Sequence, residues 1–264
     1  MGFVDVDNGK LYCELSGAGS PVVFVHGMTL DHRSFDAQVE TFARSHRVVR
    51  YDCRGYGQSS VPGAARYAHG NDLVAMLDAL GITEPVAIVG VSMGGQIAYE
   101  TALRHPQRVR AVVAVGSVLG GWSFTPKTQA IFLGLQKAAA KGGVEAAKAF
   151  WRATDLLVDG RQYPAARALV ETMIADYSGW HWQNQGNVDA LDPPMIARLG
   201  ELTMPILALV GEHDTEDAKR AAELVAKSAP RAELRRLDGL GHLLDLEAPA
   251  LFAETVLEFL ARSR

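Results

Sequence analysis

The chain has 264 residues, of which 48% are hydrophobic and 21% are charged, and its formal net charge is −4. This is the balance of an ordinary globular protein, and the length allows one large domain or a core domain that carries an insertion. Lysine and arginine are scattered without forming a basic stripe, which argues against a nucleic-acid partner.

The cysteines and the N-terminal segment exclude further classes. Cys13 and Cys53 are too few for a disulfide framework or a zinc motif, so we expect both to be reduced and semi-buried in the core. The first ten residues, MGFVDVDNGK, carry acids where a signal peptide has a basic region followed by an apolar one. No apolar run has the length that crosses a bilayer. We therefore expect a soluble, cytoplasmic protein with no membrane partner.

The predicted elements alternate between strands and helices along the chain. Residues 3–17 predict a hairpin with Asn8-Gly9 at its turn. Nearly continuous apolar runs suit strands that are buried on both faces of a parallel sheet. These runs are residues 21–25, 46–52, 85–91, 109–116 and 204–211. A further strand is predicted at residues 232–238. Amphipathic helical spacing is found at residues 71–82, 95–106 and 249–264. The alternation predicts a doubly wound α/β sheet with helices on both faces.

The alternation stops between about residues 119 and 197, where no convincing strand is found. Helical patterns replace it near residues 126–140, 143–157 and 162–177. A helical insert between two sheet strands is expected to form a cap over the carboxyl edge of the sheet, where the ligand crevice of such folds lies. The predicted domains are a core of residues 1–118 and 197–264 and a cap of residues 119–196.

A serine lies between glycines where a predicted strand runs into a predicted helix. Gly90-Val91-Ser92-Met93-Gly94 has the G-x-S-x-G pattern, and the strand–turn–helix context is that of a nucleophile elbow. In such a tight turn, side chains two residues either side of the serine collide with their neighbours, so glycine is needed there. The alternative is a serine that only caps the helix. We predict that Ser92 is a nucleophile.

A serine hydroxyl needs a base to take its proton, and the base needs an acid to orient it. The strand at residues 204–211 is followed by Glu212, Asp214, Glu216 and Asp217. Asp214 fits best because it lies at the tip of the turn, and Glu212 is the second candidate. His242 follows the last predicted strand on a glycine-flanked loop that can reach back to Ser92, so we predict that it is the base.

The remaining histidines fit this role less well. His213 adjoins the acid, and two adjacent residues at one strand end cannot both face the serine. His46, His69 and His105 lie in polar or helix-terminal stretches and are expected at the surface.

The tetrahedral intermediate of acyl transfer carries an oxyanion that backbone N–H groups must stabilise. One donor is expected to be Met93, which directly follows the nucleophile. The second is expected to be Met28, in the loop HGMTLDH after the strand at residues 21–25, where Gly27 lets the chain turn.

Five motifs together resemble the α/β-hydrolase family over essentially the whole chain. They are HGMT (26–29), YDCRGYGQS (51–59), GVSMGG (90–95), GEHD (211–214) and GLGHLLDLEAP (239–249). The resemblance implies an eight-stranded, mostly parallel sheet with a helical cap inserted after strand 6. It also implies that Ser92, Asp214 and His242 form a catalytic triad. In this family the second motif is mainly structural, so Asp52, Arg54 and Tyr56 are interpreted as supporting the fold.

Within the family, the stretches at residues 30–39 and 48–60 look most like small esterases and 3-oxoadipate enol-lactonases. Cofactor-free haloperoxidase-type hydrolases and meta-cleavage C–C hydrolases share much of the pattern, whereas the haloalkane and epoxide branches use an aspartate nucleophile. The leading hypothesis is a serine hydrolase of a small carboxylic ester or lactone that needs no metal or organic cofactor. The alternatives are a C–C hydrolase of the meta-cleavage type and a non-catalytic ligand receptor.

The aromatic residues of the cap are the sequence evidence on the substrate. Trp122, Trp180, His181 and Trp182 are predicted to line an apolar pocket, whereas Trp151, in the middle of a predicted helix, is expected to pack the cap onto the core. No arginine or lysine is clearly placed for a substrate carboxylate, which weakens the enol-lactone alternative.

Overall fold

The computed structural model describes residues 2–184 and 187–263. Among these residues, eight strands form one sheet in the order β1-β2-β4-β3-β5-β6-β7-β8. The strands are β1 (Gly2–Val6), β2 (Gly9–Ser16), β3 (Ser20–Val25), β4 (His46–Tyr51), β5 (Val86–Val91), β6 (Val109–Val115), β7 (Ile206–Gly211) and β8 (Ala232–Leu237). From β4 to β8 all neighbours are parallel, and β1 and β2 are antiparallel. The predicted mostly parallel eight-stranded α/β sheet is confirmed.

The central strands are apolar because both of their faces are covered. Every residue of β5 and of β7 is buried, as the continuous apolar runs predicted. The N-terminal hairpin turns at Asn8, whose φ of +58° suits the Asn-Gly pair. Cys13 and Cys53 are free thiols, and both are fully buried rather than semi-buried.

Helices cover the sheet and connect its parallel strands. They are α1 (Asp36–Ala43), α2 (His69–Ala79), α3 (Met93–Arg104), α7 (Glu216–Ser228), α8 (Leu244–Glu247) and α9 (Pro249–Arg262). Helix α1 packs against α9, α2 packs against α3, and α7 packs against β7 and β8. Each crossover brings the next strand back parallel, so the loops that follow the carboxyl ends of the strands gather at one edge of the sheet.

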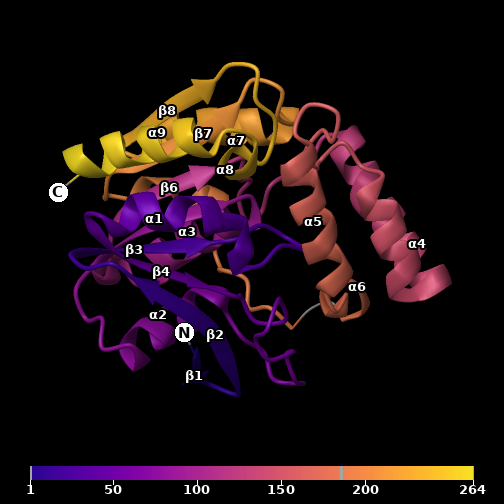
Figure 1. Ribbon diagram of the computed structural model, residues 1–264, viewed down its shortest axis with the longest axis horizontal. Helices are drawn as coiled ribbons and strands as arrows, with labels where there is room; N and C mark the ends of the chain where they lie inside the picture. The colour runs from indigo at the N-terminus through magenta and orange to yellow at the C-terminus, as the bar shows by residue number, and fades with distance from the viewer. Residues whose placement is uncertain (1, 185–186, 264) are drawn as a thin grey trace.

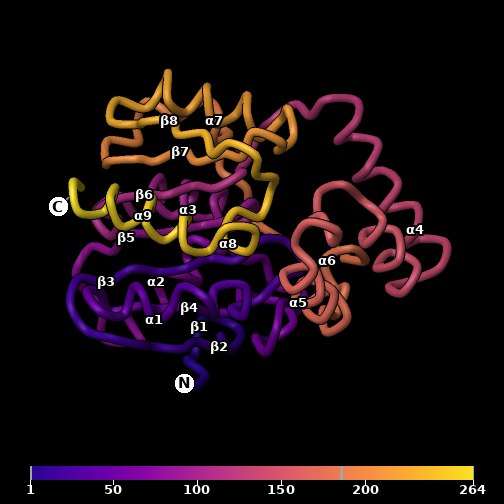
Figure 2. The backbone as a smooth tube through the Cα atoms, turned by 45° about the horizontal axis from the view of Figure 1, so that its top comes forward, coloured from indigo at the N-terminus to yellow at the C-terminus, as the bar shows by residue number. Residues whose placement is uncertain are grey.

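A helical insert follows β6 and lies at one end of the sheet (Figures 1 and 2). It consists of α4 (Pro126–Arg152), α5 (Pro164–Asp176) and the short α6 (Trp180–Gln183). The first two predicted helices are one element, α4, which is kinked where Gly143 takes a φ of +68°. Within the described residues, no helix is both long enough and apolar enough to span a membrane.

Candidate active site

Ser92 occupies a sharp turn between β5 and α3. Its φ of +55° and ψ of −114° lie outside the ordinary regions for an L-residue. A Cβ at Gly90 would lie 2.1 Å from the Gly94 carbonyl oxygen, and a Cβ at Gly94 would lie 2.0 Å from the Val25 carbonyl oxygen. Either side chain would overlap the backbone, which is why both flanking positions are glycine. The Ser92 side chain caps no N–H of α3, so the helix-capping alternative is wrong.

His242 and Asp214 form a hydrogen-bonded pair at the ends of β8 and β7. His242 Nδ1 lies 2.8 Å from Asp214 Oδ1, which also accepts from the Thr215 N–H at 2.6 Å. Asp214 is buried, and Gly116 at the end of β6 leaves room for the pair, since a Cβ there would lie 2.7 Å from Asp214 Oδ2. The hydrogen bond orients the imidazole with Nδ1 toward the carboxylate, so Nε2, on the opposite edge of the ring, points away from Asp214.

Glu212 and His213, the two neighbours of Asp214 that the sequence disfavoured, are both exposed. Glu212 accepts a hydrogen bond from the Gly239 N–H at 2.8 Å, which joins the loops after β7 and β8. The His213 side chain is 66% exposed. Neither side chain contacts the His242 ring, so the choice of Asp214 over Glu212 agrees with the geometry.

The pKa of His242 is raised above its ordinary value. Burial lowers it, but the charge of Asp214 and its hydrogen bond to Nδ1 act in the opposite direction, aided by the charges of Glu247 and Asp245. The net effect favours the imidazolium. An imidazole in this position can accept a proton, and the neighbouring carboxylates stabilise its charged form.

Two backbone N–H groups next to Ser92 are available as donors. Met93 is the first residue of α3, where helical N–H groups have no intrahelical partner. Residues 27–30 form a tight turn closed by a hydrogen bond from the Leu30 N–H to the Gly27 carbonyl (3.2 Å). In the described part of the chain, no protein acceptor pairs with the N–H of Met28 or of Met93. The positive φ of this turn is at Thr29 (+67°) and not at Gly27.

A small cavity of about 80 Å³ contains both Ser92 and His242. Apart from these two, its walls are mostly apolar and come from the turn after β3, the segment after β6 and helix α4. The apolar lining residues are Met28, Leu30, Val118, Phe124, Phe132, Trp151, Leu156, Leu157 and Leu243. The walls leave room for a short apolar group beside Ser92.

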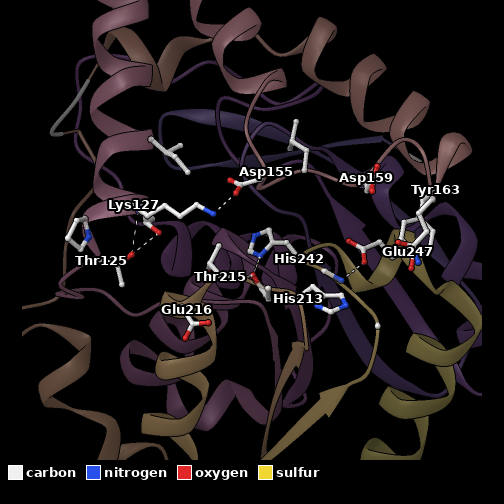
Figure 3. A pocket seen from close by; sticks show the side chains of 18 residues that line it. Thr125, Lys127, Asp155, Asp159, Tyr163, His213, Thr215, Glu216, His242 and Glu247 are labelled. Atoms are coloured by element: carbon white, nitrogen blue, oxygen red, sulfur yellow. Dashed lines mark hydrogen bonds and ion pairs between the residues drawn. The ribbon is translucent and has the colours of Figure 1, made fainter.

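A wider cavity of about 490 Å³ shares His242 with the small one and is more polar. Figure 3 shows His242 in its centre, with Lys127 of α4 and Asp155 of the cap on one side and Glu247 of α8 on the other. Lys127 lines the wider cavity and is the one lysine or arginine among the described residues that line either cavity. Its ammonium is paired with Asp155. The site therefore offers no unpaired cation to an anionic substrate.

The four side chains that the sequence suggested as a pocket do not line either cavity. The Trp122 indole donates to Asp217 at 3.0 Å and borders a separate surface groove. His181 has its two ring nitrogens 3.0 and 2.9 Å from the hydroxyls of Tyr67 and Tyr177. The neighbouring tryptophans of α6, Trp180 and Trp182, likewise lie outside the lining residues.

Trp151 is buried in the hydrophobic core, as expected, and it also lines the small cavity, which the sequence did not suggest. The docking of a cap helix on the core sets which of its aromatic residues reach the cavity. The clustering of tryptophans along the chain therefore did not indicate which of them line it. The spacing of Phe124, Phe132 and Trp151 did not mark them as a group in the sequence either.

The motif at residues 51–59 supports the fold, as interpreted. Asp52 accepts from the Gln58 N–H and from the N–H of His32, and Arg54 pairs with Asp72. His69 is buried, so its predicted surface position is wrong; burial lowers the pKa of His69 to about 3 and keeps it neutral.

One group among the described residues has the composition of a metal site: Asp31, His32 and Asp52. Arg33 pairs with Asp31, and the His32 ring is 2.7 Å from Asp52 Oδ1. Since protein partners already satisfy these side chains, the group is a structural network rather than a metal centre.

Asp245 is a buried acid close to the site. Within the described residues neither of its carboxylate oxygens has a hydrogen-bond partner. Burial raises the pKa of Asp245 to about 7. Because the pKa in the folded protein is above that of the unfolded chain, ionisation costs stability as pH rises from about 4 to 7.

We expect Asp245→Asn to raise the free energy of unfolding at pH 8 by up to about 4 kcal/mol, since the variant removes a charge that folding disfavours. The gain should shrink to below about 1.5 kcal/mol at pH 4.5. Urea unfolding at the two pH values measures it, with Asp238→Asn at an exposed carboxylate as the matched control. An equal gain at both pH values contradicts the explanation.

Comparison with known proteins agrees with this architecture. Residues 20–249 match the family described as the alpha/beta hydrolase fold. A putative 2-succinyl-6-hydroxy-2,4-cyclohexadiene-1-carboxylate synthase of Bacillus subtilis is 27% identical over 275 residues, which cover 97% of each chain. A 2-hydroxy-6-oxononadienedioate/2-hydroxy-6-oxononatrienedioate hydrolase of Cupriavidus pinatubonensis is 30% identical, with 98% of this chain and 94% of the relative covered.

Among solved structures, Est816, described as an N-acyl homoserine lactone degrading enzyme, superimposes with a TM-score of 0.81. It is 28% identical, and the match covers 98% of this chain and 100% of Est816. The family match spans most of the chain and includes the loops that carry Ser92, Asp214 and His242. The chain therefore belongs to the α/β-hydrolase fold family, and it is a hydrolase of that fold.

Proposed function

We propose that this hydrolase cleaves a small carboxylic ester or lactone through an acyl-enzyme on Ser92. One observation carries the proposal: Ser92, on its strained turn, shares a small and mostly apolar cavity with His242, whose Nδ1 is hydrogen-bonded to Asp214. A nucleophile, a base and an orienting acid in this order are what acyl transfer needs.

The reaction follows from these positions. Ser92 Oγ attacks the carbonyl carbon while His242 Nε2 takes its proton, and Asp214 stabilises the imidazolium. The N–H groups of Met28 and Met93 stabilise the oxyanion. His242 then protonates the leaving alkoxide, and a water molecule activated by His242 releases the acid from Ser92 by the reverse route. No step uses a metal ion or an organic cofactor.

Hydrolysis of a C–C bond is the second candidate, because a relative at 30% identity is named as a hydrolase of a dienedioate. A dioate carries two carboxylates, and burying a carboxylate without a cation is costly. The described residues that line the cavity around Ser92 include no lysine or arginine, and Lys127 in the wider cavity is already paired with Asp155. The charge of the site therefore favours an uncharged ester or lactone.

A matched pair of esters tests this preference. We expect kcat/KM for p-nitrophenyl butyrate to exceed that for p-nitrophenyl hemisuccinate at least about 30-fold, because the hemisuccinate places a carboxylate where butyrate has a methyl group. Release of p-nitrophenolate is measured for both under the same conditions. Equal or faster turnover of the hemisuccinate contradicts the proposed preference and favours an acidic substrate.

The proposal as a whole is tested by labelling with a fluorophosphonate and by turnover of p-nitrophenyl acetate and butyrate. We expect one label, on the peptide that contains Ser92, together with ester turnover. A label on Ser92 without turnover of either ester overturns the esterase proposal in favour of C–C hydrolysis or of a narrow lactonase. Folded protein that takes no label overturns the catalytic proposal and leaves a ligand receptor.

A further inference from the structure

The turn that presents the Met28 N–H contains a residue in an unfavourable backbone conformation. Thr29 has a φ of +67°, in the left-handed region, and is almost completely buried. For a β-branched residue this conformation is an outlier, and glycine or asparagine is usual at the third position of such a turn. The hydrogen bond that closes the turn runs from the Leu30 N–H to the Gly27 carbonyl and does not involve the Thr29 side chain.

The cap supplies the contact that holds Thr29. The Trp151 indole N–H donates to Thr29 Oγ1 at 3.0 Å, across 122 positions of sequence. Trp151 lies in the last turn of α4, and its side chain is buried while it lines the cavity beside Ser92. Indole nitrogen is a donor only, so in this buried place the hydroxyl of Thr29 gives it the partner that it needs.

We propose that Trp151 is a positioning residue for the turn at residues 27–30, which carries the Met28 N–H and is called the oxyanion turn below. By fixing Thr29 Oγ1 it keeps Thr29 in the left-handed conformation, and this keeps the Met28 N–H directed at the carbonyl oxygen that Ser92 attacks. The turn is then competent only while the end of α4 is seated on the core. The proposal rests on the proposed function, since it assigns a task within the same reaction.

The physical reason for a catalytic effect is the steep geometric dependence of oxyanion stabilisation. The donor has to lie at hydrogen-bond distance from the oxyanion, and a small displacement of the turn weakens the transition state more than the bound substrate. If the bond to Trp151 is lost, Thr29 can relax to a negative φ and carry the preceding peptide groups with it. The loss is therefore expected in kcat and not in KM.

Single variants at the two ends of the bond test the first step. Trp151→Phe keeps an aromatic wall and removes the N–H, and Thr29→Val keeps the β-branch and removes the acceptor. We expect each to lower kcat for p-nitrophenyl butyrate about 10- to 100-fold with KM changed less than about threefold. The double variant should be no worse than the poorer single variant, because both changes break one interaction.

A glycine background separates positioning from packing. Thr29→Gly adopts the left-handed conformation without a side chain to hold, so adding Trp151→Phe in this background should lower kcat less than about threefold. A second readout is a butyl trifluoromethyl ketone, which forms an oxyanion on Ser92. Its inhibition constant should rise in parallel with the loss of kcat for Trp151→Phe.

Lys148→Met is the matched control. Lys148 lies on the same helix and its ammonium donates to the Ala175 carbonyl at 2.7 Å, within the cap and away from the turn. We expect its kcat to be unchanged, and thermal unfolding of every variant verifies that it is folded. An equal loss from Trp151→Phe in both backgrounds, or a loss confined to KM, overturns the positioning role. If the wild type neither takes the label nor turns over ester, the proposed function itself fails.

Discussion

Ser92→Ala is expected to lower kcat for p-nitrophenyl butyrate by about 10⁴- to 10⁶-fold and to abolish labelling by a fluorophosphonate. Without the hydroxyl no acyl-enzyme forms, and the cavity and its N–H donors retain only a small part of the acceleration. The fold should be kept, because the Ser92 side chain makes no capping bond to α3. Turnover, labelling and thermal unfolding are measured on the same preparations.

Ser20→Ala provides the control for this result, since Ser20 is exposed at the start of β3, at the opposite end of that strand from the turn at residues 27–30. It should turn over ester and take the label as the wild type does. More than about 1% residual kcat in folded Ser92→Ala protein, or a label that remains, means that another group is the nucleophile.

Asp214→Asn is expected to lower kcat about 10³- to 10⁴-fold. The carboxylate accepts from His242 Nδ1 at 2.8 Å and so selects the tautomer in which Nε2 can take the proton of the serine; an amide does not impose that tautomer. The carboxylate also stabilises the imidazolium that forms during attack. Asparagine fits the same buried space, so the loss is chemical rather than a matter of folding.

The pH profile gives a second signature of the same variant. Activity needs neutral His242, so the activity of the wild type falls as pH drops through the pKa of His242, which Asp214 helps to raise. Removing that charge moves the acid limb of kcat/KM to lower pH. The profile between pH 4.5 and 9 measures the shift. The control is Glu212→Gln, which changes the exposed second candidate for the acid and should leave both the profile and kcat unchanged. An unshifted acid limb in Asp214→Asn contradicts the pairing.

The sheet and the elbow could be predicted from the sequence because their determinants are local. Continuous apolar runs such as those of β5 and β7 occur only where both faces are buried, and alternation with amphipathic helices implies parallel strands. Gly90 and Gly94 reveal the turn around Ser92, since any side chain there overlaps the backbone within a few residues. The order of strand ends was enough to suggest Asp214 and His242, and the structure brings these two within hydrogen-bond distance.

The tertiary structure alone decided what surrounds Ser92. Trp151 lines the cavity and the tryptophans of α6 do not, because the docking of the cap on the core, and not the sequence of either helix, sets which residues reach it. The burial of His69 and the left-handed Thr29 have the same origin. The bond from Trp151 to Thr29 joins residues 122 positions apart, and no local pattern encodes a contact at that range. The sequence thus determined the fold and suggested the proposed reacting groups, whereas packing between distant segments determined the shape and charge of the space around them.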